Sequence, residues 1–244
     1  TKKLNLKEND LVIDIGSNDG NLLNHFKESR KCKVVGIEPA KHIARMSNKH
    51  GITTINSFFD KKTVKKINIK FGKARLITAN NVFANIENIN SWIILVKQLL
   101  AEDGFFVIES FYLADLLKNK VFDFIYHEHH SAFSLKPIEY LCKKHNLKLV
   151  HAEQTNSKGG SLRYYLCRKN SNYKKSGSIS SLKKREINAN QIELLCRLKN
   201  TFWKFGLISN KEWFFKNVKS NDLNLFLKKD KVLIGYTLLR KRIF

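Results

Sequence analysis

Proline and glycine are scarce in this sequence, with 2 Pro and 11 Gly among 244 residues. Their scarcity excludes collagen-like and linker-like chains and disfavours a turn-dense all-β fold. No run approaches the roughly 18 consecutive apolar residues that a membrane-spanning helix needs. The first ten residues do not resemble a secretory signal peptide. We therefore expect a globular protein that is not embedded in a membrane.

Cysteine is also sparse, and no two cysteines form a CxxC pair. The four cysteines are Cys32, Cys142, Cys167 and Cys196. Such spacing provides neither a zinc-ligand motif nor a dense disulfide framework. We expect all four to be small core residues in a reducing, cytoplasmic compartment.

Acidic residues are few relative to basic ones. There are 21 Asp and Glu against 45 Lys and Arg, which gives a net charge of +24. Such a charge suits nucleic acid, an anionic membrane surface or a phosphorylated substrate, but it also arises from a Lys-rich composition. Because the basic residues are spread along the chain, we favour compositional bias and do not expect a nucleic-acid partner. Hydrophobic residues make up 43% of the chain and include 17 Phe, which excludes general disorder.

Short apolar runs alternate with longer helical patterns, which predicts a doubly wound, mostly parallel α/β sheet. Strands are expected at 11–14, 33–38, 51–55, 74–79 and 105–109, and helices at about 20–29, 40–50, 90–101 and 136–145. Two later strands, at about 147–153 and 161–168, are predicted to form an antiparallel hairpin through the turn at 158–160. These elements form the first expected domain, residues 1–168.

The sequence changes character after residue 168. Residues 169–186 are rich in Ser, Asn and basic residues, and we expect a basic linker or an exposed helix start. Residues 187–244 are expected to contain a long amphipathic helix and the first strand of an incomplete second α/β unit at 232–236.

A glycine-containing turn follows the first strand. It runs from Asp14 to Gly20 and also contains Gly16 and Asn18, and Glu38 ends the next strand 24 residues after Asp14. Glycines allow a ligand to approach the backbone closely, and an acidic residue at that strand end binds the ribose hydroxyls of a nucleoside. Because the three-glycine pyrophosphate cradle is missing, the pattern favours S-adenosyl-L-methionine over a dinucleotide.

Further candidates lie at other strand ends. Asn80 and Asn81 end the fourth strand, where paired amides can hold the amino-acid end of the cofactor or simply cap the strand. Phe59 can cover an adenine or face the core. The expected cofactor-binding residues are Asp14, Gly16, Asn18, Gly20, Glu38, Pro39, Phe59, Asn80 and Asn81.

The segment Tyr126-His-Glu-His-His130 concentrates groups that titrate near neutral pH. It lacks the HExxH spacing of a metal-binding helix, so no metal is expected. The alternative is a polar structural loop.

Several segments resemble the sugar C-methyltransferase family. They are VIDIGSNDGNLL (12–23), GIEPA (36–40), ITANNVFANI (77–86), GFFVIES (104–110), FDFIYHEHHSAFSL (122–135) and GGSLRYY (159–165). The resemblance implies a class I methyltransferase-type fold and methylation of a carbon in a nucleotide-linked keto-deoxy sugar. By motif, His129 is the implied base, with Glu128 and Tyr126 orienting it or stabilising an enolate.

The sequence departs from the family's pattern in three places, and alternative functions have to be considered. The paired-Cys zinc module at the amino terminus is missing, Asn85 stands where relatives carry His, and the residues after Gly235 and Tyr236 differ from the family's GYGAxAKG motif. A truncated, catalytically impaired cofactor-binding remnant is therefore one alternative. An RNA methyltransferase, suggested only by the charge, is the other.

Overall fold

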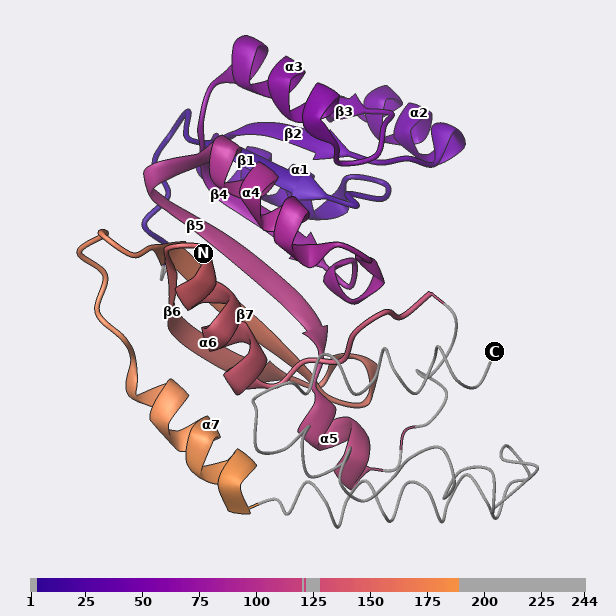
Figure 1. The fold of residues 1–244 in the computed structure, drawn as a ribbon. Coiled ribbons are helices and arrows are strands. Elements are labelled where there is room, and N and C mark those ends of the chain that lie inside the picture. Colours follow the sequence, from indigo (N-terminus) through magenta and orange to yellow (C-terminus); the bar gives the residue numbers. More distant parts are fainter. Residues whose placement is uncertain (1–3, 120, 122–127, 189–244) are drawn as a thin grey trace.

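The computed structural model describes residues 4–119, 121 and 128–188 (Figure 1). A seven-stranded sheet in the order β3-β2-β1-β4-β5-β7-β6 forms its centre. The strands are β1 (Leu11–Ile15), β2 (Lys33–Ile37), β3 (Thr54–Ile55), β4 (Ala74–Asn80), β5 (Leu100–Phe111), β6 (Leu147–Thr155) and β7 (Ser161–Arg168). Strands β1 to β5 pair in parallel, whereas β7 is antiparallel to β5 and β6. The predicted doubly wound sheet with an added hairpin is confirmed.

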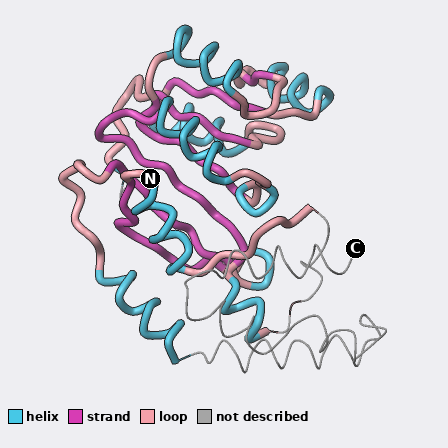
Figure 2. The backbone as a smooth tube through the Cα atoms, viewed as in Figure 1, coloured by secondary structure: helices cyan, strands magenta, loops and turns pink. Residues whose placement is uncertain are grey.

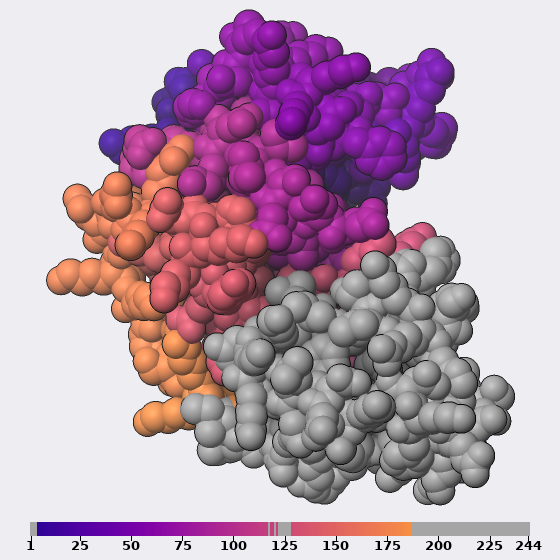
Figure 3. All heavy atoms as spheres, viewed as in Figure 1, coloured from indigo at the N-terminus to yellow at the C-terminus, as the bar shows by residue number. Residues whose placement is uncertain are grey.

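Helices lie on both sides of the sheet (Figure 2). They are α1 (Asn21–Arg30), α2 (Lys41–Lys49), α3 (Lys61–Phe71), α4 (Ile89–Leu99), α5 (Leu113–Lys118), α6 (Leu135–Lys144) and α7 (Gly177–Asn188). The 3-10 turns η2 (Phe83–Asn85) and η3 (Ser157–Gly159) complete the described elements used below. In the space-filling view, the purple N-terminal half and the later red and orange elements are in contact (Figure 3).

Two apolar layers hold the sheet. The larger one contains buried side chains of α3, α4, α6 and α7, and the smaller one contains Leu23 and Phe26 of α1. An aromatic group of Phe83, Trp92, Phe106 and Phe133 lies inside the larger layer, with neighbouring ring centroids 5.0–6.2 Å apart. Burial of these rings fixes the η2 turn, which follows directly from the end of β4.

The structure differs from the predicted elements in several places, including β5, α3 and α7. Strand β5 begins at Leu100, five residues before the predicted start. Helix α3 was not predicted from its Lys-rich sequence, although Asp60 caps it by accepting a hydrogen bond from the Thr63 N–H at 2.8 Å. Within the expected linker, residues from Gly177 on form α7, which buries Ile179 and Leu182 against the larger layer.

The predicted domain boundaries stay a prediction, because residues 189–244 lie outside the described part. Cys32, Cys142 and Cys167 are buried and form no disulfide, as expected, while Cys196 lies outside that part. No helix within residues 4–119, 121 and 128–188 is long and apolar enough to cross a membrane.

Helix α3 offers a matched pair of substitutions that tests the larger layer. Ile67 is fully buried and Ile69, on the opposite side of the same helix, is 77% exposed. Ile67→Ala should lower the free energy of unfolding by about 2–5 kcal/mol, because it removes buried methyl groups and leaves a cavity. Ile69→Ala should change it by less than about 0.5 kcal/mol. Urea unfolding followed by circular dichroism measures both, and equal losses would contradict this packing.

Candidate cofactor and catalytic site

The predicted cofactor residues gather where the parallel strands end. β1 lies between β2 and β4, so their carboxyl ends share one edge of the sheet. The chain leaves β1 toward β2 on one side, and β4 adjoins β1 on the other, which makes this edge the switch point of the topology. Ligands of open α/β sheets bind at such a point.

The turn after β1 presents its backbone at this edge. Gly16 has a φ of 73°, and a Cβ atom there would lie 2.3 Å from Val82 Cγ2 in the loop after β4. Gly20, with a φ of 83°, precedes α1, and a Cβ there would lie 2.5 Å from Ser47 Oγ. Both positions therefore require glycine, and Gly16 lets the loops after β1 and β4 pack directly together.

Glu38 is held at the end of β2 by backbone donors. Its Oε2 accepts a hydrogen bond from the Asn18 N–H at 3.1 Å, and its Oε1 accepts one from the Ala40 N–H at 2.8 Å. The Asn56 amide donates to the carbonyl oxygens of Glu38 and Pro39 at 3.0 and 2.8 Å. Each carboxylate oxygen has more than one acceptor position, so this fixed group can still accept hydrogen bonds from ligand hydroxyls.

Asp14 lies deeper, inside β1. Its Oδ1 accepts a hydrogen bond from the Thr78 hydroxyl of β4 at 2.5 Å. Burial raises the pKa of Asp14 to about 7; the Thr78 hydrogen bond opposes this increase, and the nearby Glu38 charge adds to it. Thr78 was not predicted as a site residue, and its place opposite Asp14 follows only from the register of β1 and β4.

The end of β4 carries the paired amides. Asn80 is opposite Glu109 of β5, and the Asn81 N–H donates to the Glu109 carbonyl oxygen at 2.8 Å. Asn81 has a left-handed φ of 56°, and its buried Oδ1 accepts no hydrogen bond within the described part of the chain. This acceptor, the bare backbone at Gly16 and the Glu38 carboxylate fit a ligand that carries hydroxyl and amino donors.

Phe59 is half-buried beside the core, and its adenine-covering role stays a prediction. Its ring packs edge-on against Trp92 of α4, with centroids 4.9 Å apart, and it contacts the larger apolar layer. Its neighbour Phe58 is 75% exposed.

The described part of the predicted catalytic segment, residues 128–130, adjoins the same edge. His129 is buried, and its ring centroid lies 4.8 Å from that of Phe111, the last residue of β5. The N–H groups of His130 and Ser131 both donate to the Ala84 carbonyl oxygen, at 2.8 and 3.1 Å. The segment is thereby tied to the turn that follows Asn81. Glu128 is exposed, and Tyr126 lies outside the described residues.

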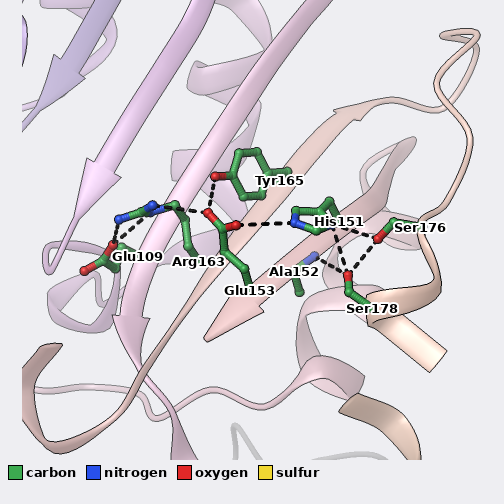
Figure 4. A network of polar contacts seen from close by, with 8 residues as sticks. All are labelled: Glu109, His151, Ala152, Glu153, Arg163, Tyr165, Ser176 and Ser178. Carbon is green, nitrogen blue, oxygen red and sulfur yellow. Dashed lines mark hydrogen bonds and ion pairs between the residues drawn. The ribbon is translucent and has the colours of Figure 1, made fainter. Parts of the chain in front are cut away.

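A charged network that sequence reasoning did not assign lies beside this edge (Figure 4). Arg163 of β7 donates to Glu109 Oε2 through two nitrogens, at 2.9 and 2.6 Å, and to Glu153 Oε1 at 3.2 Å. The Tyr165 hydroxyl also donates to Glu153, and His151 joins the network on the far side. The two-point Arg163 contact holds β7 against the end of β5.

Comparison with known proteins finds similarity to methyltransferases. Residues 2–152 match the family described as methyltransferase domain. The C-methyltransferase NovU of Streptomyces niveus is 38% identical over 161 residues, which are 66% of this chain and 38% of NovU. The chain thus spans well under half the length of that relative.

Solved methyltransferase structures share the fold. A putative methyltransferase of Haloferax volcanii, solved with the Trm112 activator, is 10% identical with a TM-score of 0.56, over 68% of this chain and 86% of that one. The magnesium protoporphyrin IX methyltransferase of Synechocystis, solved with S-adenosylmethionine, is 12% identical with a TM-score of 0.51, over 68% and 73%. These similarities confirm the predicted class I methyltransferase fold. The chain belongs to the methyltransferase domain family.

Proposed function

We propose that this methyltransferase adds a methyl group to a carbon of a nucleotide-linked keto-deoxy sugar. The observation that carries the proposal is the position of His129, which is buried against the end of β5. The next residues, His130 and Ser131, donate to Ala84 in the turn after Asn81. The similarity to a C-methyltransferase and the YHEHHS and GGSLR strings support it. A cytoplasmic location belongs to the same proposal.

The cofactor would be held by the edge formed by β1, β2 and β4. Glu38 would accept hydrogen bonds from the ribose hydroxyls, and Asn81 Oδ1 would accept one from the amino-acid end. Gly16 and Gly20 would let the adenosine side approach the backbone, with Asp14 and Asn18 shaping the turn. Pro39 and Asn80 would border the site at the ends of β2 and β4. When bound, S-adenosyl-L-methionine supplies an electrophilic methyl group.

The protein's own contribution to the reaction is a proton transfer. The ketone acidifies the neighbouring C–H bond, and the His129 imidazole would remove that proton so that its electron pair forms the enolate. Glu128 and Tyr126 would orient His129 or, through the Tyr126 hydroxyl, stabilise the enolate oxygen. The enolate carbon is then the nucleophile, and the enzyme's main further role is to position it.

Two alternatives remain as outcomes of the tests below. A cofactor-binding remnant would bind S-adenosylhomocysteine but would not deprotonate any keto sugar. An RNA methyltransferase would bind RNA tightly at physiological salt, where contacts made by scattered surface charges are weak. The site offers no observation that favours RNA over a sugar.

Glu38 tests the cofactor edge. Glu38→Gln should weaken S-adenosylhomocysteine binding by about 1–3 kcal/mol, because one of two fixed acceptor oxygens becomes a donor. The matched control is Glu28→Gln, because Glu28 is exposed on α1 away from the carboxyl ends of the strands. This variant should bind S-adenosylhomocysteine with unchanged affinity. Calorimetric titration measures both, and unchanged affinity in Glu38→Gln would remove Glu38 from the site.

His129 tests the proton transfer. With a nucleotide-linked keto-deoxy sugar in deuterated water, the intact chain should exchange the proton on the carbon next to the ketone. His129→Asn should abolish this exchange, while S-adenosylhomocysteine binding should stay nearly unchanged. The control His50→Asn, at the exposed end of α2, should exchange normally.

Proton NMR of the sugar follows the exchange directly. Exchange at the native rate in His129→Asn would show that the base lies elsewhere. No exchange by the intact chain with any such sugar would favour the remnant.

A further inference from the structure

A polar cavity of about 360 Å³ lies at the turn between β6 and β7, next to α5 and α7. Every residue that lines it is charged, carries an amide or hydroxyl, or is glycine. They are Asp115, Lys118, Asn119, Gln154, Thr155, Asn156, Gly159, Gly160 and Arg185. An apolar ligand or a stacked aromatic ring would find no matching surface here, so the cavity suits a small polar ligand.

The backbone keeps this cavity open. Gly160 has a φ of 124°, and a Cβ there would lie 2.6 Å from Asp115 Cβ, so any larger residue would clash with the wall. The Asn119 side-chain amide donates to the Gly159 carbonyl oxygen at 3.0 Å and joins the end of α5 to the turn. The cavity is therefore built by tertiary contacts between segments 40 residues apart in sequence.

The single carboxylate in the wall is already engaged. Asp115 is buried, one of its oxygens pairs with Arg185, and the other accepts a hydrogen bond from the Gln154 amide at 2.8 Å. Its charge is balanced by Arg185, and each of its oxygens already has one donor. With its one carboxylate neutralised, the cavity lacks the cluster of carboxylates that usually holds a divalent cation.

The remaining groups favour an anion. Lys118, in the last turn of α5, forms no ion pair with another described residue, and Arg185 keeps N–H donors beyond its contact with Asp115. With Asp115 neutralised by Arg185, the Lys118 ammonium is the one charge of the lining that no described residue pairs with. An ammonium and amide donors around a polar cavity are the groups that bind phosphate oxygens.

The cavity adjoins the candidate base. The Tyr112 N–H donates to the Gly160 carbonyl oxygen at 3.0 Å, and the preceding residue, Phe111, packs against the His129 ring. The cavity wall and the base thus contact consecutive residues at the end of β5. In a nucleotide-linked sugar the diphosphate is bonded to the sugar ring, so it must lie close to the carbon that loses its proton.

We propose that this cavity binds the diphosphate of the nucleotide-linked substrate, with Lys118 as the principal charged contact. The assignment rests on the proposed function for the identity of the substrate, but diphosphate binding itself needs neither cofactor nor methyl transfer. Arg185 holds the wall through Asp115 and contributes its remaining donors.

Titration of the intact chain with inorganic pyrophosphate at physiological salt tests the proposal. One saturable site is expected, and Lys118→Gln should weaken it by about tenfold because a charged hydrogen bond is lost. The matched control is Lys158→Gln. Lys158 is an exposed lysine on the adjacent η3 turn that does not line the cavity, and its loss should change affinity by less than about twofold. No saturable binding, or equal losses in the two variants, would overturn the proposal.

A second titration with uridine diphosphate separates a free anion from a nucleotide. Uridine diphosphate should bind at the same site, and Lys118→Gln should weaken its affinity by the same factor as for pyrophosphate. If Lys118→Gln loses affinity for pyrophosphate but not for the nucleoside diphosphate, the substrate assignment is contradicted. The proposed function fails separately, through proton exchange or S-adenosylhomocysteine binding, so the two failures are distinguishable.

Discussion

The close approach of Gly16 to Val82 is the constraint on which the site depends. Because Gly16 has no Cβ, the turn after β1 packs directly on the loop after β4, and both loops stay at the switch point of the sheet. The same turn supplies the Asn18 N–H that holds Glu38. Beyond Val82 the chain forms η2, whose Ala84 carbonyl anchors the segment that carries His129. One steric requirement therefore connects the cofactor edge with the candidate base.

Charge is distributed unevenly around this edge. The protein carries a net charge of +24, yet the proposed cofactor edge contains the buried acids Asp14 and Glu38. Acceptors at that edge suit a ligand with hydroxyl and amino donors, whereas Lys118 at the β6–β7 turn suits an anion. The acidic end of the site would thus attract the cationic methyl donor, and the Lys118 end would attract the phosphorylated methyl acceptor. His129 adjoins the strand end between them.

The sequence predicts the parts of this arrangement that depend on local patterns. Strands β1, β2 and β4 and the glycine turn were predicted because apolar runs and Gly16 and Gly20 are local signals. Helix α3 was missed because its many lysines hide an apolar stripe, although its cap at Asp60 was a usable signal. The Thr78 contact with Asp14 and the Arg163 contact with Glu109 join residues 64 and 54 positions apart, and strand register decides them.

The central claim is that the β1–β2–β4 edge holds the cofactor and adjoins His129. A crystal structure of the chain with S-adenosylhomocysteine tests it most directly. The account predicts ribose hydroxyls within hydrogen-bonding distance of the Glu38 carboxylate, the amino-acid end at Asn81, and the sulfur on the side of the ligand that faces His129. A ligand bound at another edge of the sheet, or with His129 on the side away from the sulfur, would contradict it.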